Sequence, residues 1–121
     1  MSSTPVTWFE ISSDRPDEAQ RFYADLFGWS LEEQGGPAGS YRQTTAGGER
    51  GIGGAIRGTD AGNYAIFYAE VADVAEICRR AEATGGVVVT GPVTTPAGLV
   101  RALLRDPSGN LLGVFTPPAG G

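Results

Sequence analysis

The residue types in this chain limit the chemistry that it can perform. The sequence contains no His, so it lacks the side chain that most often serves as a metal ligand and as a general base. Its single Cys, Cys78, excludes an intramolecular disulfide and a thiolate zinc cluster, and its helical spacing favours a packing role. All nine basic residues are Arg, which excludes Schiff-base and P-loop lysine chemistry.

Glu10 is the carboxylate of greatest interest, because it lies in an aromatic and β-branched segment. Two interpretations of it are open. Glu10 either moves a proton as a general base among apolar neighbours, or it accepts a hydrogen bond from an adjacent strand. The sequence shows no obvious second group that would act with it. Glu10 is therefore the catalytic candidate only if the protein is an enzyme.

Size and charge narrow the class of protein further. The chain has 121 residues, 40% of them hydrophobic, which predicts one globular domain with a core of its own. A net charge of −5 argues against nucleic acid as a partner. The sequence has no apolar run of about 20 residues, and its first residues do not resemble a signal peptide, so we expect a cytoplasmic protein with no membrane partner.

The first half of the sequence predicts the order β-α-β-β-β. Residues 6–11 have the composition of a strand. Ser or Asp at 12–14 and Pro16 are typical of a helix start, and Gly28 is typical of a helix end. The apolar residues at helical spacing between them are Ala19, Phe22, Tyr23 and Leu26. The later segments are extended structure at 29–31, a Gly-rich loop or lid at 34–40, a strand at 41–45, a turn at 46–50 and a strand at 51–56.

The second half repeats this order at an offset of 58 residues, which relates Phe9 to Phe67 and Gly28 to Gly86. Asp73 is the expected N-cap of its helix. The expected strands of this half are 63–71, 87–90, 99–105 and 111–115, with a loop at 91–98 and a tight turn at 106–110. We therefore predict an α+β domain of two βαβββ modules, one at about 5–58 and the other at about 62–116, with a frayed tail at 117–121.

Three segments carry a resemblance to a known family. They are Trp8-Phe-Glu-Ile11, Arg21-Phe-Tyr-Ala-Asp-Leu-Phe-Gly-Trp29 and Asp106-Pro-Ser-Gly-Asn110. Together they resemble the glyoxalase/bleomycin-resistance/dioxygenase superfamily, also called vicinal oxygen chelate proteins. The resemblance spans nearly the whole chain. It implies paired βαβββ modules whose curled mixed sheets surround a cavity, and a homodimer for a small member.

The resemblance also implies positions for metal ligands, and this sequence departs from the family there. The corresponding residues are Trp8, Ile66 and Gly113, with a fourth position somewhere in 51–56. Their side chains cannot bind a divalent ion, and a catalytic metal needs about three protein ligands. We therefore expect no metal and no cofactor.

Strand alternation predicts what lines the cavity instead. Trp8 and Glu10 share one face of their strand, whereas Phe9 and Ile11 face the helix, beside Phe22 and Leu26. In the second half, Phe67, Ala69 and Val71 are expected to pack on the helix. The predicted ligand-binding residues are Trp8, Glu10, Trp29, Tyr41, Tyr64, Ile66, Tyr68, Leu111, Gly113 and Phe115. Such a lining suits a flat or bulky apolar ligand.

Several roles remain open within this list. Trp8 either lines an open cavity or fills it, Tyr64 and Tyr68 either bind ligand or lie at a dimer interface, and Trp29 and Tyr41 lie either in the core or at the rim. The favoured function is sequestration of an aromatic or polycyclic natural product without turnover, as in bleomycin-resistance proteins. The alternatives are a metal-free biosynthetic enzyme that uses Glu10 or a Tyr, and a non-catalytic dimer with a filled core.

Overall fold

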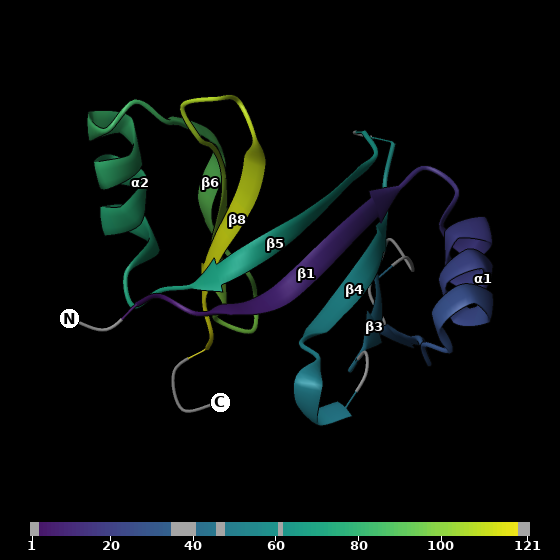
Figure 1. Cartoon of the computed structure of the whole chain (residues 1–121). Helices are drawn as coiled ribbons and strands as arrows, with labels where there is room; N and C mark the ends of the chain where they lie inside the picture. Colours follow the sequence, from purple (N-terminus) through teal and green to yellow (C-terminus); the bar gives the residue numbers. More distant parts are fainter. Residues whose placement is uncertain (1–2, 35–40, 46–47, 61, 119–121) are drawn as a thin grey trace. The chain divides into compact units, whose positions relative to one another are not determined.

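The computed structural model describes residues 3–34, 41–45, 48–60 and 62–118. Within these ranges the chain forms eight β-strands and two α-helices, a mixed α+β fold (Figure 1). Residues 35–40 of the expected lid and residues 46–47 of the expected turn lie outside the described residues. No helix in the described part is long and apolar enough to cross a membrane.

The chain divides into two compact units. The N-terminal unit is Trp8–Ile66, and the C-terminal unit is Phe67–Gly121 together with Met1–Thr7. The chain passes between them within β1 (Val6–Ser13) and within β5 (Tyr64–Glu70).

The N-terminal unit has the predicted β-α-β-β-β order. After β1 come α1 (Pro16–Phe27), β2 (Glu32–Gln34), β3 (Tyr41–Thr44), a short 3₁₀ helix (Gly48–Arg50) and β4 (Gly53–Gly58). The spatial order is β2-β3-β4-β1, in which only the β4–β1 pairing is parallel. Gly28 ends α1 with φ 72°, as expected. The N-cap is Arg15 rather than a Ser or Asp, and Pro16 takes the first helical position.

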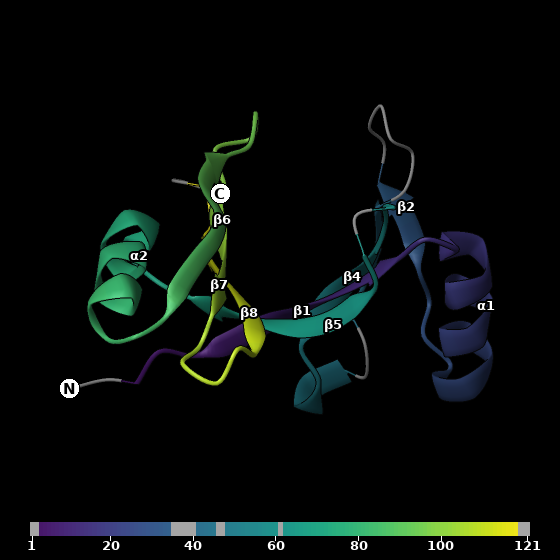
Figure 2. The same ribbon diagram turned by 90° about the horizontal axis from the view of Figure 1, so that it is seen from above.

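The C-terminal unit repeats this order with α2 (Val74–Ala83), β6 (Val87–Thr94), β7 (Val100–Arg105) and β8 (Leu111–Thr116). The spatial order is β5-β8-β7-β6. Helix α2 covers one face of β6, β7 and β8 (Figure 2). Its expected N-cap, Asp73, accepts a hydrogen bond from the amide of Glu76 at 3.1 Å. The core of this unit lies between α2 and the sheet and consists of Val74, Cys78, Ala102, Leu104 and Val114.

The 58-residue offset holds in the strand register. Glu10 pairs with Ala55 across β1 and β4, and Tyr68, 58 residues later, pairs with Gly113 across β5 and β8. The next residues along keep the same relation, because Ile11 pairs with Ile56 and Ala69 with Val114. The predicted internal repeat is thus a repeat of structure as well as of sequence.

Two predicted segments differ from the structure. The chain after α1 does not resume extended structure until Glu32, because the Trp29 ring turns back onto Tyr23 and Phe9. The predicted loop at 91–98 begins inside a strand, since β6 continues to Thr94. Register shifts between β6 and β7 accommodate Gly91 and Pro92. β6 is an edge strand, where a Pro without an amide hydrogen is tolerated.

The apolar stripe expected on α1 is also corrected. Phe22 and Leu26 are each 57% exposed, so they do not pack beside Phe9 and Ile11. The less exposed residues of α1 lie on a neighbouring stripe that contains Ala19 and Tyr23. In the C-terminal unit Phe67 is likewise exposed, although Ala69 and Val71 pack against the core as expected.

Candidate functional site

One face of the N-terminal sheet gathers most of the predicted site residues of that unit. Strand alternation places Trp8 and Glu10 on this face, and the register adds Tyr41 and Gln43 from β3. Tyr64 reaches the same face, as its hydroxyl contacts Glu10. We call this surface, made of Trp8, Glu10, Tyr41, Gln43 and Tyr64, the Glu10 face.

The centre of this face is a buried carboxylate. Glu10 is only 3% exposed, and Tyr64 Oη donates a hydrogen bond to Glu10 Oε2 at 2.8 Å. Glu10 therefore accepts a hydrogen bond from a neighbouring strand, as one of its two interpretations expected. A buried carboxylate usually has such a donor, because its desolvation is otherwise costly. The structure also supplies what the sequence did not show, a second proton-carrying group within reach of Glu10.

A small cavity lies beside Trp8. Its volume is about 270 Å³, and its lining includes Trp8, Glu32, Gln43, Thr44 and Gly53. The absence of a side chain at Gly53 lets the Trp8 indole approach the neighbouring strand, since a Cβ at that position would come within 2.8 Å of the ring. Trp8 thus packs on β4 and still borders open space.

Trp29 does not join the Glu10 face. Its ring stacks on Tyr23 at 5.4 Å between ring centroids, and it contacts Phe9 and Phe27 at 5.2 Å and 5.3 Å. Phe9 points to the opposite side of β1 from Trp8 and Glu10. Trp29 therefore belongs to an aromatic cluster on the helix side of the sheet.

The remaining predicted residues, Tyr68, Leu111, Gly113 and Phe115, share a face of the C-terminal sheet that points away from α2. Tyr68 is 3% exposed and contacts Phe115 edge to face at 6.1 Å. Arg101 lies on the same face and donates a hydrogen bond to Tyr68 Oη at 3.3 Å. Ile66 is buried at the end of the N-terminal unit.

The positions that correspond to the family's metal ligands do not fit a metal ion. The side chains of Trp8 and Ile66 have no atom that can ligate a metal ion. At Gly113 the Tyr68 ring occupies the space that a side chain would need. Across the described ranges, no three His, Cys, Asp or Glu side chains gather into a possible ion site. The absence of a bound metal remains a prediction, which rests on the residue types at positions 8, 66 and 113.

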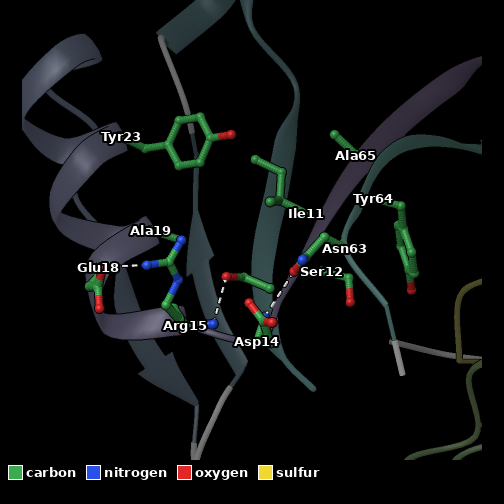
Figure 3. Close-up of a pocket in the computed structure, with 11 residues that line it drawn as sticks. Ile11, Ser12, Asp14, Arg15, Glu18, Ala19, Tyr23, Asn63, Tyr64 and Ala65 are labelled. Carbon is green, nitrogen blue, oxygen red and sulfur yellow. Dashed lines mark hydrogen bonds and ion pairs between the residues drawn. The ribbon is translucent and has the colours of Figure 1, made fainter. Parts of the chain in front are cut away.

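A larger cavity, of about 480 Å³, lies elsewhere in the N-terminal unit, beside the first turns of α1 (Figure 3). One wall is the helix, and the opposite wall is formed by Asn63, Tyr64 and Ala65. The amide of Asp14 donates to Asn63 Oδ1 at 2.9 Å, and this contact ties the end of β1 to that wall. Sequence reasoning missed this cavity, because its walls come from segments about 45 residues apart.

An ion pair between a buried Arg42 and an exposed Asp17 also joins α1 to its sheet. Arg42 Nη2 donates to Asp17 Oδ1 at 2.8 Å, and the Arg42 side chain is 7% exposed. Within the described part of the chain, Arg42 Nε and Nη1 have no hydrogen-bond partner. Since Arg42 alternates with Tyr41 and Gln43 along β3, it lies on the helix side and not on the Glu10 face.

Comparisons with known proteins agree with this architecture. Residues 6–114 match the family model described as Glyoxalase/Bleomycin resistance protein/Dioxygenase superfamily. The relative named "Putative glyoxylase CFP32" from Mycobacterium bovis is 30% identical over 114 residues, which are 93% of this chain. This chain spans less than half, 44%, of the length of that curated relative.

Two solved structures share the fold at low identity. Methylmalonyl-CoA epimerase from Mycobacterium tuberculosis aligns with a TM-score of 0.62 and 18% identity over 97% of this chain and 92% of its own. A superfamily member from Vibrio splendidus 12B01 aligns with a TM-score of 0.65 and 16% identity over 95% of this chain and 100% of its own. The duplicated strand register and the match over residues 6–114 identify the chain as a member of the glyoxalase/bleomycin resistance/dioxygenase superfamily.

Proposed function

We propose that the Glu10 face binds a small aromatic or polycyclic organic molecule and holds it without chemical change, as a sequestering protein does. The observation that carries this proposal is the cavity of about 270 Å³ beside the Trp8 ring. It is close to the lower end of the usual range for ligand pockets, about 300–1,000 Å³. An indole at the edge of such a cavity offers a flat surface on which an aromatic ring can stack.

The energetics are compatible with useful affinity. Each aromatic contact contributes about 0.5–1.5 kcal/mol beyond the burial of apolar surface. Two or three such contacts, together with about 25 cal/mol for each Å² of apolar surface buried, would support sub-micromolar binding after the cost of association. Glu32 and Gln43, which line this cavity, would orient polar groups on the ligand, and Glu32 would favour a cationic group.

The two Trp residues make a clean test possible, because they occupy different environments. Trp29→Phe leaves Trp8 as the sole tryptophan, and Trp8→Phe leaves Trp29. Polycyclic and DNA-cleaving antibiotics are titrated against each variant and the wild type while tryptophan fluorescence is recorded. We expect saturable quenching in the wild type and in Trp29→Phe, and none in Trp8→Phe. Sequestration is the wrong function if no compound binds more tightly than about 100 µM, roughly −5.5 kcal/mol.

The hydrogen bond between Tyr64 and Glu10 favours a second candidate, a metal-independent enzyme that moves a proton. The Glu10 carboxylate would accept a proton from an acidic carbon of the substrate, and the Tyr64 hydroxyl would orient that carboxylate. The named relatives include a glyoxylase and an epimerase, both of which are enzyme names. This support is indirect, since the epimerase likeness concerns the fold alone.

Deuterium exchange separates the two candidates. A bound ligand with an acidic C–H bond is incubated with the protein in D₂O, recovered and weighed by mass spectrometry. Proton transfer predicts deuterium uptake by the ligand that is lost in Glu10→Gln and reduced in Tyr64→Phe. Sequestration predicts a ligand recovered at its original mass from all three proteins.

A further inference from the structure

The cavity of about 480 Å³ beside α1 takes no part in the proposed function. It lies between the first turns of α1 and the start of β5, whereas the smaller cavity lies beside Trp8. Among the described residues, none lines both cavities. Its volume falls within the usual range for pockets that bind small molecules, about 300–1,000 Å³. The lining of this cavity, which we call the α1 cavity, indicates what kind of molecule fits it.

Part of the α1 cavity is apolar. Ala19 lines it from the helix, Ile11 from β1 and Ala65 from β5. Figure 3 shows the Tyr23 ring extending from α1 toward Ile11, with its hydroxyl group at the far end. In the described part of the chain this hydroxyl has no hydrogen-bond partner. The cavity therefore offers packing surface for a hydrocarbon body and, at Tyr23, a hydroxyl that can bind a polar group.

Charged side chains line the α1 cavity at the first turn of the helix. Arg15 and Glu18 form an ion pair, in which Arg15 Nη1 lies 3.3 Å from Glu18 Oε2. The Asp14 carboxylate has no hydrogen-bond or ion-pair partner within the described ranges. The Asp14 backbone is held in place, because its amide donates to Asn63 Oδ1 at 2.9 Å. The lining thus has an excess of one negative charge, which is complementary to a cation.

The separation of the charged end from the Tyr23 hydroxyl sets the length of the ligand. Arg15 and Tyr23 are eight residues apart, which corresponds to a rise of about 12 Å along a helix axis. Because side chains reach into the cavity from both ends, a molecule of about 8–10 Å would connect Asp14 with Tyr23. That is the length of an ammonium group joined through a short chain to one substituted aromatic ring.

We propose that the α1 cavity binds a small organic amine, in which an ammonium group and a hydrogen-bonding group flank an apolar body about one ring in size. The ammonium group donates hydrogen bonds to Asp14 and Glu18. The body packs on Ile11 and Ala65, and the far group bonds to the Tyr23 hydroxyl. Phenolic amines such as tyramine belong to this class. The inference does not rest on the proposed function, because the two cavities have different linings.

Tyramine is the probe, and ¹H–¹⁵N NMR of the full chain measures its binding. A molecule of about ten non-hydrogen atoms should bind weakly, with a dissociation constant of about 0.1–5 mM. The amide signals that move should include those of Asp14, Arg15 and Ala65. The anion 4-hydroxyphenylacetate should bind at least about fivefold more weakly, because its carboxylate meets like charge. Phenethylamine, which lacks the hydroxyl group, should bind about two- to tenfold more weakly.

Matched charge variants separate this site from a general attraction of cations to an acidic protein. Asp14→Asn with Glu18→Gln should weaken tyramine binding about fivefold or more, because it removes both carboxylates that face the ammonium group. Asp25→Asn with Glu82→Gln removes the same two charges from exposed positions outside the cavity. This control should weaken binding less than about twofold, since distant surface charges are screened.

Three variants test the position of the ligand. Ala65→Phe fills the cavity from the wall opposite α1 and should weaken tyramine binding at least about tenfold, whereas Trp8→Phe should leave it unchanged. In Tyr23→Phe, tyramine and phenethylamine should bind equally well. If Ala65→Phe melts at a much lower temperature than the wild type, the charge variants decide the question.

Three results would overturn the proposal. They are a dissociation constant for tyramine above about 20 mM, equal binding of the anion, and equal weakening by the two pairs of charge variants. Loss of binding in Trp8→Phe with full binding in Ala65→Phe would place the amine in the smaller cavity. That outcome would support the proposed function and refute the site at α1.

Discussion

Replacing Tyr64 by Phe removes one hydroxyl group and keeps the ring in place. That hydroxyl donates to Glu10 Oε2 at 2.8 Å, and Glu10 is 3% exposed. Hydrogen bonds to charged groups contribute about 1.5–3 kcal/mol to stability. Because Glu10 is buried, water does not easily replace the hydroxyl that Tyr64→Phe removes. The loss reaches the upper part of this range if the Glu10 carboxylate stays buried, and the lower part if it moves toward solvent. We expect Tyr64→Phe to lower the free energy of unfolding by about 1.5–3 kcal/mol.

Urea unfolding followed by circular dichroism measures this change, provided that both proteins unfold in one transition. For a chain of this size, about 4 °C of melting temperature corresponds to 1 kcal/mol, so the melting temperature should fall by about 6–12 °C. Tyr23→Phe is the matched control. Its ring also packs in the N-terminal unit, but among the described residues its hydroxyl has no hydrogen-bond partner. The control should change stability by less than about 0.5 kcal/mol.

A double-mutant cycle with Glu10→Gln assigns the effect to the pair. If the hydroxyl acts through Glu10, the loss caused by Tyr64→Phe should shrink by at least about 1 kcal/mol in the Glu10→Gln background. If Tyr64→Phe and Tyr23→Phe differ by less than about 0.5 kcal/mol, the hydrogen bond does not stabilise the fold. The reasoning that makes Glu10 and Tyr64 a unit would then be wrong.

Three other predictions concern the C-terminal unit. Gly113→Ala should lower the free energy of unfolding by about 1–3 kcal/mol in urea, because the new Cβ would overlap the Tyr68 ring, and the loss should shrink when Tyr68→Ala is also present. In an NMR titration the pKa of Asp106 should lie below that of an ordinary aspartate, because hydrogen bonds from Asn110 favour the carboxylate, and Asn110→Ala should raise this pKa. The stability that the Asp106 carboxylate contributes is therefore present above the unfolded-state pKa and is lost as the pH falls through the folded-state pKa. Burial raises the pKa of the Cys78 thiol, so a thiol reagent at pH 8 should modify the native protein far more slowly than the unfolded chain.

The sequence was sufficient to predict the repeat and the faces of the central strands. Alternation along β1 correctly separated Trp8 and Glu10 from Phe9 and Ile11, because a strand with one buried face leaves little freedom of register. The glycine at 28 and the Asp at 73 fixed the end of one helix and the start of the other, through local hydrogen bonds and backbone geometry.

Sequence reasoning failed where a side chain had two possible partners. Phe22 and Leu26 have the spacing of a core stripe, but Ala19 and Tyr23 on the neighbouring stripe turn toward the sheet instead. Hydrophobic spacing shows that a helix has an apolar side, and it does not show whether that side meets its own sheet or another molecule. Trp29 was ambiguous for a similar reason, since only the folded chain brings Tyr23 and Phe9 to its ring.

The duplicated halves have kept their register and have diverged in chemistry. Glu10 and Tyr68 occupy equivalent places, 58 residues apart, opposite Ala55 and Gly113, and each is 3% exposed. The Tyr68 ring lies against Gly113, so a carboxylate side chain introduced there would first have to displace that ring. The missing side chain at position 113 and the presence of Tyr68 are therefore physically linked. Of the two equivalent positions, only the one in the N-terminal unit holds a carboxylate, and this asymmetry is why we assign the proposed proton transfer to Glu10.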